Sequence, residues 1–294
     1  MNTQLLYTDN YFITKFIGAG SFGEVYAAID NKNSKKVAVK IEKKTNESRI
    51  NYEYKIYKYF ELHKLTEGIP NVYDYIETTD FNMMFMQLLG PSLDDLFIKF
   101  NKKFSLSTVF LLGIKIINIL KNIHKNNYIH RDIKPNNFLI GLNSKKDDIY
   151  ITDFGLSKRY IVKGEHINFT HRKPLIGTAR YASVNMHMGI EPSRRDDLES
   201  FGYMLVYFLK GILPWQGIKK EKNKSNNQYL EQIGEIKMCT SLDKLCENLP
   251  VCFKEYLSYC KKLKFDEEPD YDYLKQLFEL ESVARKIPLK FDWI

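Results

Sequence analysis

The feature that most constrains the fold is a change of residue pattern near Gly90–Pro91. Before it, apolar and polar residues alternate as they do in half-buried strands. The predicted strands are Tyr11–Ile17, Glu24–Ile29, Lys36–Ile41, Val72–Glu77 and Asn82–Leu88, and Asn31–Ser34 has the polar turn chemistry to join two of them as a hairpin. Among them, Asn51–Leu62 is predicted to be a helix, because Ile50, Tyr54, Tyr57 and Leu62 recur at helical intervals.

After Gly90–Pro91 the pattern becomes helical. The predicted helices are Leu93–Lys99, Ser107–His124, Arg195–Lys210, Tyr229–Lys237, Lys244–Glu247, Pro250–Leu263 and Tyr271–Arg285, with Ser107 as a cap and Pro250 in a first turn. A strand-rich part followed by a helix-rich part predicts an α+β chain of two lobes. We place a small β-rich N-lobe at about 1–87, a hinge at about 87–92 and a larger helical C-lobe at about 93–294.

Composition excludes several classes of protein. Hydrophobic residues make up 44% of the chain and charged residues 27%, which are ordinary globular values, so wholesale disorder is excluded. No apolar run approaches the roughly 18–20 residues that span a bilayer, since Phe110–Leu120 is short and carries Lys115. Met1–Asn10 lacks the pattern of a signal peptide, so we expect a cytosolic protein, with nuclear entry left open.

Charge and cysteine content add two expectations. The 44 basic and 36 acidic residues give a net charge of +8, which favours an anionic partner without choosing among nucleic acid, phosphate, acidic peptide and membrane surface. The four cysteines form no C-x-x-C pair, so they are predicted to be reduced thiols, some of them in the core.

The first candidate binding motif along the chain is the glycine motif Gly18-x-Gly20-x-x-Gly23-x-Val25. Alone it is a weak signal, because dinucleotide-binding folds use the same spacing and an ordinary glycine hairpin is also possible. A dinucleotide site needs a helix directly after the glycines, whereas here strand-like residues follow, up to Ile29. The glycines would let this loop lie close to phosphate oxygens, with Phe22 at its tip covering the site.

Lys40 ends the apolar strand residues Val37-Ala38-Val39, and Ala38 leaves room for a flat ligand. Together with the glycine loop, Lys40 is well placed to neutralise phosphate charge. Its ammonium needs a carboxylate to orient it, and we assign Glu53 over the competing Glu47 and Glu61.

The most informative stretch is His130–Leu139, which packs an Asp, a Lys and an Asn beside apolar anchors. Asp132 could accept the proton of an attacking hydroxyl, and Lys134 could stabilise charge on a transferred phosphoryl group. Asn137 offers a hard oxygen to Mg²⁺, and Asp153, in Asp153-Phe154-Gly155, supplies a second, charged ligand.

In this order, the glycine loop, Val37–Lys40, His130-Arg131-Asp132 and Asp153-Phe154-Gly155 resemble the signature of the eukaryotic protein kinases. Further stretches resemble the casein kinase 1 family in particular, as does Ser183-Val184-Asn185 where most kinases have Ala-Pro-Glu. These stretches are Leu88–Phe97, Gly177–Ser183, Ser193–Ser200, Leu213–Gly217 and Phe265–Tyr271. The resemblance runs from about Tyr11 to Leu280.

The resemblance implies a single protein kinase domain over residues 1–294, with ATP held at the hinge. Met86 would guard the back of the adenine pocket, Gln87 and Leu89 would offer backbone groups to adenine, and Asp197 would brace the catalytic loop. The family usually has Glu at Gln87 and Asp at Asn136, and we expect activity to survive both departures. The implied ATP-binding residues are Ile17, Gly18, Ala19, Gly20, Ser21, Phe22, Gly23, Val25, Ala38, Lys40, Met86, Gln87 and Leu89.

The resemblance also implies serine or threonine acceptors that follow acidic or phosphorylated residues. Arg180 matches part of the family's anion pocket, and its guanidinium suits bidentate phosphate contact. Asn226-Asn227-Gln228 stands where the family carries a lysine, so Lys173, Lys222 or Lys224 would have to compensate. We assign Arg180, Gly217, Lys173 and Lys224 to this pocket.

For regulation, the activation segment Leu156–Ile176 holds Thr170 but no obvious phosphate switch, and the chain stops at Ile294 without a long tail. We therefore expect a monomeric, constitutively active kinase that uses ATP and Mg²⁺ and binds no membrane. One alternative is a catalytically silent, pseudokinase-like scaffold, although every phosphate, metal and base position is filled. Another is a nucleic-acid binder, but no recognised motif supports more than weak, salt-sensitive binding.

Overall fold

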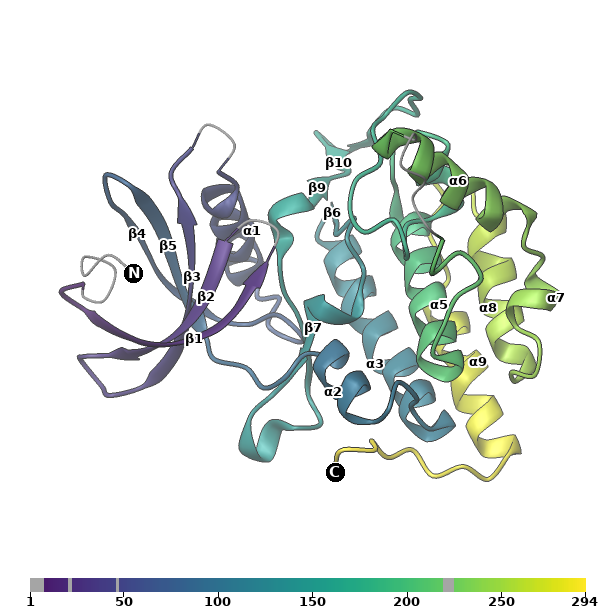
Figure 1. The fold of residues 1–294 in the computed structure, drawn as a ribbon, viewed down its shortest axis with the longest axis horizontal. Helices are drawn as coiled ribbons and strands as arrows, with labels where there is room; N and C mark the ends of the chain where they lie inside the picture. Colours follow the sequence, from purple (N-terminus) through teal and green to yellow (C-terminus); the bar gives the residue numbers. More distant parts are fainter. Residues whose placement is uncertain (1–7, 21–22, 46–47, 219–224) are drawn as a thin grey trace. The chain divides into compact units, whose positions relative to one another are not determined.

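The computed structural model describes residues 8–20, 23–45, 48–218 and 225–294. The chain forms two compact units (Figure 1). The first contains Met1–Gly90 and Leu139–Gly155, and the second contains Pro91–Phe138 and Leu156–Ile294. The chain is α+β, as predicted, with the strand-rich part first.

The first unit is built on a five-stranded antiparallel sheet with the strand order β1-β2-β3-β5-β4. The predicted strands are all present, with ends that differ by a few residues. They are β1 Tyr11–Gly20, β2 Gly23–Asp30, β3 Lys36–Lys43, β4 Val72–Glu77 and β5 Phe81–Gln87. The predicted hairpin turn joins β2 to β3, where the Asp30 carboxylate accepts the Lys32 N–H at 2.9 Å.

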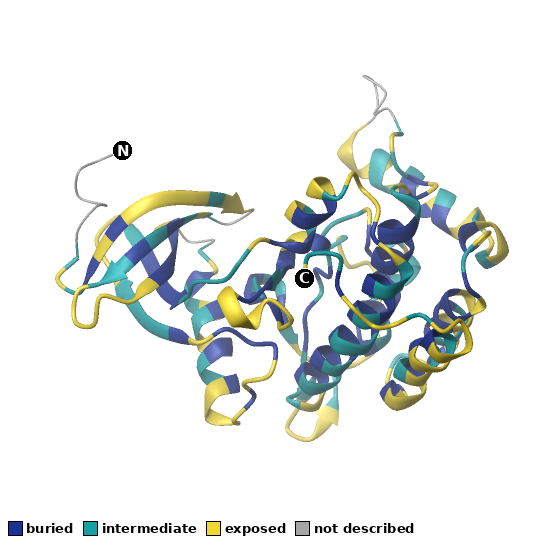
Figure 2. Cartoon of the chain, turned by 90° about the horizontal axis from the view of Figure 1, so that it is seen from below, coloured by how far each residue is buried: buried dark blue, intermediate teal, exposed yellow. Residues whose placement is uncertain are grey.

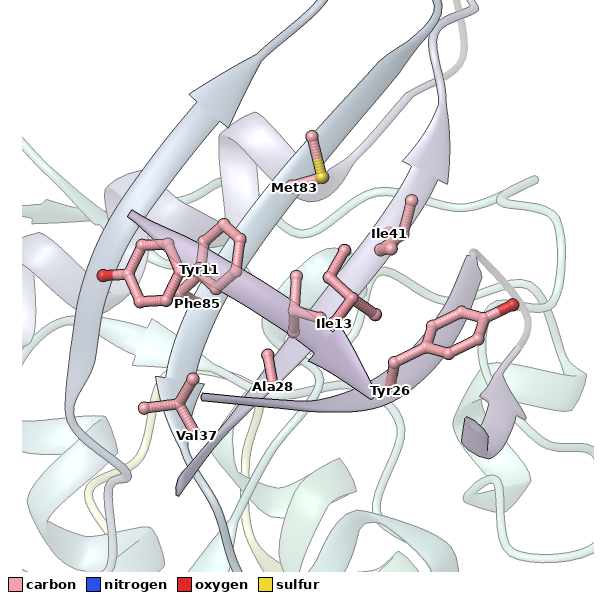
Figure 3. Close-up of a cluster of buried hydrophobic side chains, with 9 residues drawn as sticks. Tyr11, Ile13, Tyr26, Ala28, Val37, Ile41, Met83 and Phe85 are labelled. Carbon is pink, nitrogen blue, oxygen red and sulfur yellow. The ribbon is translucent and has the colours of Figure 1, made fainter. Parts of the chain in front are cut away.

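The two faces of this sheet differ because side chains alternate along each strand. One face carries an apolar cluster (Figure 3). The cluster contains Tyr11, Ile13, Tyr26, Ala28, Val37, Val39, Ile41, Met83 and Phe85. Alternation therefore places Ala38, Lys40 and Met86 on the opposite face.

Helix α1, Ile50–Leu62, packs against β4 and β5. Its buried side chains are Ile50, Glu53, Ile56, Tyr57 and Phe60. Leu62, one of the residues whose helical spacing predicts this helix, is the last residue of α1 and is 79% exposed, so it does not belong to the buried face. At 3.6 residues per turn, Leu62 lies about 120° around the helix from Ile50.

The segment Leu139–Gly155 belongs to the first unit, although the sequence-based boundaries assign these residues to the C-lobe. Strands β7, Phe138–Ile140, and β8, Ile149–Ile151, pair with each other. The Ile151 N–H donates to the Gly68 carbonyl at 2.8 Å, and the Gly90 N–H donates to the Ile140 carbonyl at 2.8 Å. These backbone bonds attach the segment to the earlier part of the chain.

The second unit is helical, and α3 and α5 form its buried centre (Figure 2). Helix α3 packs mainly against α9 and α5, and α5 packs against α8. The predicted helices are all present: α2, Leu93–Lys99, has the predicted ends, and the ends of the others differ from the prediction by up to three residues. Together with the short α4, they are α2 Leu93–Lys99, α3 Leu106–Lys125, α4 Val184–His187, α5 Arg194–Lys210, α6 Asn226–Cys239, α7 Leu242–Leu245, α8 Val251–Lys262 and α9 Tyr271–Ala284. Short strand pairs, β6 Tyr128–Ile129 with β9 Lys158–Arg159 and β10 Ile161–Val162 with β11 Glu165–His166, complete this unit.

Helix α3 is longer and more apolar than the sequence run suggested. Its 20 residues include a window of mean hydropathy 1.6, so by length and composition it could cross a membrane, which corrects the expectation that no segment is long enough. Side chains such as Phe110, Ile116 and Leu120 are fully buried within the second unit. These contacts are those of a core helix.

The N-terminus of α3 also differs from the prediction. Ser105, and not Ser107, is the N-cap, and its hydroxyl accepts the Thr108 N–H at 3.2 Å. Ser107 instead donates to the Lys290 carbonyl at 2.7 Å, while the Asp292 carboxylate accepts the Ser105 N–H at 2.9 Å. The residues after α9 are thereby fastened to the start of α3.

The cysteines behave as predicted. All four are free thiols; Cys246, Cys252 and Cys260 are buried, and Cys239 is exposed. Burial raises the pKa of Cys252 to about 12, so this thiol is not poised for reaction at neutral pH.

Candidate functional site

Strand register brings the predicted nucleotide residues of the first unit together. Lys40 on β3 pairs with Val25 on β2 and with Met84 on β5. Two residues before Lys40 on β3, Ala38 pairs with Met86. The predicted Ala38, Lys40 and Met86 therefore occupy neighbouring positions on one face of the sheet.

Lys40 is at the centre of a buried charge cluster. Its Nζ lies 2.6 Å from Glu53 Oε2, on α1, and 2.9 Å from Asp153 Oδ1. Burial alone would lower the pKa of Lys40, but the Glu53 and Asp153 carboxylates more than offset this effect and raise it above its ordinary value. Lys40 is therefore a fixed cation held by two carboxylates. The competing Glu61 pairs with Lys58 instead, and Glu47 lies outside the described residues.

The segment after Asp153 is fastened to the same helix. The Phe154 N–H donates to Glu53 Oε1 at 3.3 Å, and the Phe154 ring makes edge contacts with Tyr57 and Phe60 of α1. Asp153 itself has a positive φ of 67°, a backbone conformation that is uncommon for residues other than glycine. Packing of Phe154 against α1 therefore helps to set the position of the Asp153 carboxylate.

A second carboxylate of β3, Glu42, holds the start of α1. The N-cap residue of α1 is Arg49, whose side chain makes no capping bond. The Glu42 carboxylate accepts the Ser48 hydroxyl at 2.8 Å and the N–H groups of Arg49 at 3.0 Å and Ile50 at 2.9 Å. A carboxylate at this end of a helix also interacts favourably with its dipole. Strand β3 thus holds α1 at two points, Glu42 and Lys40.

The glycine motif forms the hairpin end of β1 and β2, as predicted from the strand-like residues that follow it. Gly18 pairs with Val25, and Gly20 pairs with Gly23. A Cβ on Gly23 would lie 2.4 Å from the Ile41 carbonyl oxygen, so this position requires glycine for close approach to β3. Ile17 and Ala19 are exposed, and the predicted Ser21 and Phe22 lie outside the described residues.

The predicted hinge residues follow β5. Met86 is buried, and Gln87 and Leu89 are half-buried. The Gln87 N–H donates to the Asn71 carbonyl at 2.8 Å, and Gln87 Oε1 accepts the Asn71 N–H at 3.3 Å. Because the backbone N–H of Gln87 is committed to Asn71, the main-chain group that Gln87 could offer to a ligand is its carbonyl.

In the second unit, Asp132 lies in a buried polar group. Asp132 is 5% exposed, and its carboxylate lies 2.6 Å from Lys134 Nζ and accepts the Thr178 hydroxyl at 2.8 Å. Asn137 donates through Nδ2 to the Asp132 carbonyl oxygen at 2.8 Å. The structure thus brings together the three predicted catalytic-loop residues and adds Thr178.

Asp197, on α5, holds the backbone before Asp132. Its carboxylate accepts the His130 N–H at 2.7 Å and the Arg131 N–H at 2.8 Å, and it lies 3.0 Å from His124 Nε2. Burial alone would raise the pKa of Asp197, but hydrogen bonding from His124 and the interactions with His130 lower it overall. These bonds keep Arg131 at a φ of 68°, in the left-handed region.

Of the four residues predicted for the anion pocket, Arg180, Lys173 and Gly217 lie within the described residues. The exposed Arg180 guanidinium lies 5.8 Å from the Tyr181 ring centroid and 5.6 Å from that of Tyr207. Lys173 is paired with Glu191 at 3.4 Å. Gly217 is exposed and has a φ of 74°, and Lys224 lies outside the described residues.

Sequence reasoning gave no role to Glu42, Thr178, His124 and Lys237. Glu42 could have been found, because residues two apart on a strand share a face and Lys40 was already assigned. Thr178 lies in the stretch Gly177–Ser183, which was identified only by its resemblance to the casein kinase 1 family. No local signal distinguished His124 or Lys237 from the other basic residues on helices.

Comparison with models of known protein families supplies independent evidence. The family model described as the protein kinase domain matches residues 11–279. This match includes Lys40, Glu53, Asp132, Asn137 and Asp153.

Proposed function

The chain belongs to the protein kinase family, and we propose that it is a serine/threonine kinase of the casein kinase 1 type. Membership of the family supports ATP binding, phosphotransfer and protein substrates. The acceptor type, the casein kinase 1 resemblance and the roles of individual residues are the proposal.

The observation that carries the proposal is the setting of Asp132. A carboxylate that receives Lys134 and Thr178 on its two oxygens is held in one orientation, as a base for a hydroxyl must be. In our proposal Asp132 accepts the proton of the acceptor hydroxyl. Lys134, whose ammonium is adjacent, stabilises the charge on the phosphoryl group as it is transferred.

The nucleotide side of the proposal rests on the first unit. Lys40, fixed by Glu53 and Asp153, would bind the phosphates of ATP beneath the glycine hairpin. Protein kinases generally use Mg²⁺, and the oxygens of Asn137 and Asp153 are of the hard type that this ion prefers. Mg²⁺ would supply positive charge that neutralises the phosphates of ATP.

Label transfer from ATP tests the reaction. The wild-type chain should phosphorylate casein on serine or threonine, whereas Asp132→Asn, which keeps the shape but not the basicity of the side chain, should reduce the rate by at least about a hundredfold. Phosphoamino-acid analysis of the product separates serine, threonine and tyrosine. Equal activity of wild type and Asp132→Asn would exclude Asp132 as the base. No transfer by the wild-type protein would instead favour a silent scaffold.

Substrate preference needs a separate test. We propose that Arg180 recognises an acidic or phosphorylated residue of the substrate, because its exposed guanidinium is supported by two tyrosine rings. Peptides with phosphoserine, Asp or Ala three residues before the acceptor should differ in KM, and Arg180→Ala should remove the difference. A flat response in the wild-type protein would leave the kinase activity standing and remove this preference.

We also propose that activity needs no upstream kinase. The buried Glu191 carboxylate pairs with Lys158 at 2.8 Å and Lys173 at 3.4 Å, so it links two parts of the activation segment without a phosphate. Turnover should therefore not change when the protein is incubated first with ATP or with another kinase. A many-fold rise after such treatment would contradict this.

A further inference from the structure

Lys237 is a buried lysine that the proposed reaction does not use. It lies on α6, and its side chain is 1% exposed. An ammonium is costly to bury unless its donors are satisfied. Nζ donates to the carbonyl oxygens of Ala179 at 2.7 Å and Ala182 at 2.5 Å. It also lies 5.2 Å from the Tyr203 ring centroid and 5.0 Å from that of Trp215.

Both carbonyls belong to one loop, Gly177–Ser183, which we call the 177–183 loop. The carbonyl between them, that of Arg180, accepts the Trp215 indole N–H at 2.7 Å. Three carbonyls of the loop are thus held by side chains from outside it: Lys237 of α6, Trp215 of the segment after α5, and His187 of α4, whose Nε2 lies 3.2 Å from the Ala179 oxygen. A short loop with its carbonyls satisfied in this way has little freedom to change its backbone conformation.

The other side of the same loop carries groups of the proposed reaction. Thr178, directly before Ala179, donates to Asp132 Oδ1 at 2.8 Å. Arg180, the proposed anion-binding residue, lies between Ala179 and Tyr181. The loop therefore connects Lys237 and Trp215 with both the proposed base and the proposed recognition residue.

We propose that Lys237 is a positioning residue for phosphotransfer: by holding the Ala179 and Ala182 carbonyls, it fixes the loop that keeps Thr178 on Asp132 and presents Arg180. This inference rests on the proposed function. Burial lowers the pKa of Lys237 well below its ordinary value. A neutral amine retains two N–H groups, so the two hydrogen bonds do not depend on the charge.

Lys237→Met tests the role, because methionine keeps much of the length and apolar volume of the side chain but has no donor. The Ala182 carbonyl would lose its side-chain partner, and the Ala179 carbonyl would keep only the His187 ring nitrogen at 3.2 Å, so the loop would relax. We expect the KM for a protein substrate to rise about tenfold and kcat to fall, roughly the effect of losing one or two net hydrogen bonds. The affinity for a fluorescent ATP analogue should change less than about twofold, because Lys237 bonds the 177–183 loop, whereas the proposed phosphate-binding Lys40 is held by Glu53 and Asp153.

Lys254→Met is the matched control. Lys254 is an exposed lysine of α8 that pairs with the exposed Asp243, and its removal should leave both constants unchanged. If Lys237→Met does not fold, Trp215→Phe provides the test, because it removes only the bond to the Arg180 carbonyl and keeps a ring beside Lys237. It should raise the KM for the protein substrate in the same direction.

The outcomes separate the two proposals. A wild-type protein that transfers no phosphate refutes the proposed function. An active wild type with an unchanged protein-substrate KM in Lys237→Met, or in Trp215→Phe if the former is unfolded, overturns the positioning role. A fall in kcat alone, in proportion to the folded fraction, would assign Lys237 to stability only and would equally overturn it.

Discussion

Replacement of Glu42 should release the start of α1 from β3. The carboxylate accepts one hydroxyl and two helix N–H groups, and Ile50, which carries one of these N–H groups, is 1% exposed. Loss of a capping acceptor costs about 1–2 kcal/mol, and hydrogen bonds to charged groups contribute about 1.5–3 kcal/mol. We therefore expect Glu42→Ala to lower the free energy of unfolding by about 2–3 kcal/mol. Glu42→Gln, which keeps one acceptor oxygen, should lower it by about 1 kcal/mol.

The effect should extend to the reaction because Glu53 lies in the first turn of α1. If the whole 2 kcal/mol acted on the contact between Lys40 and Glu53, the transfer rate would fall about thirtyfold. Urea unfolding measures the loss of stability, and for a typical dependence on urea concentration the unfolding midpoint should shift by about 1 M. Faster hydrogen exchange at the Arg49 and Ile50 amides would show that the loss of stability lies at the start of α1. Label transfer to casein measures the fall in the rate of the reaction.

Glu77→Gln is the control for this series, since Glu77 is a partly exposed residue of β4 whose carboxylate pairs with the partly exposed Lys44. Its free energy of unfolding should stay within about 0.5 kcal/mol of wild type. The reasoning fails if both Glu42 variants unfold at the wild-type urea concentration. It also fails if they are destabilised while the Arg49 and Ile50 amides exchange at the wild-type rate.

Three further predictions concern the second unit. Gly177→Ala should reduce the rate of phosphotransfer at least about tenfold, because Gly177 has a φ of 79° and an added Cβ would lie 2.4 Å from the Arg131 carbonyl oxygen. Steady-state kinetics measure this rate, and a wild-type rate would contradict the prediction. Asp197→Asn should lower kcat and should lower the free energy of unfolding by about 2–3 kcal/mol, because an amide has one acceptor oxygen for two backbone N–H groups. An unchanged kcat and an unchanged urea midpoint would refute the bracing role. Burial lowers the pKa of His187 to about 4, so between pH 6.5 and about 4 the unfolded chain binds a proton that the folded chain does not, and stability should fall as the pH falls through this window. His187→Asn should flatten that dependence in urea titrations, and an unaltered slope would exclude His187 as its source.

The sequence was most informative where periodicity and strand pairing act locally. The strand Val72–Glu77 and the helix Leu93–Lys99 were predicted with the observed ends, because turn residues delimit both. The spacing of Leu62 helped to predict α1 correctly, but an apolar residue near a helix end can lie off the buried face, and Leu62 is exposed. Ser105 and Ser107 are both plausible caps, and the choice between them depends on the distant residues 288–292.

In the candidate site, too, the residues marked by local sequence motifs were predicted, and those held by distant parts of the chain were not. Motif spacing was enough to select Lys40, Asp132 and Asp153, because the chemistry needs those side-chain types in that order. The supporting groups were not found, because their partners lie far away in the sequence. Lys237 contacts carbonyls of residues 179 and 182, and His124 contacts Asp197, so only the folded chain shows that these basic residues are buried.

The grouping of Leu139–Gly155 with the first unit has a consequence for dissecting this protein. A fragment that ends at Gly90 would contain every strand of the large sheet but neither Asp153 nor Phe154. Tyr57 and Phe60 would expose the surfaces that the Phe154 ring covers, and Lys40 would keep one carboxylate partner instead of two. Independent expression of the first unit therefore requires a chain in which residues 139–155 are joined to 1–90 by an engineered linker.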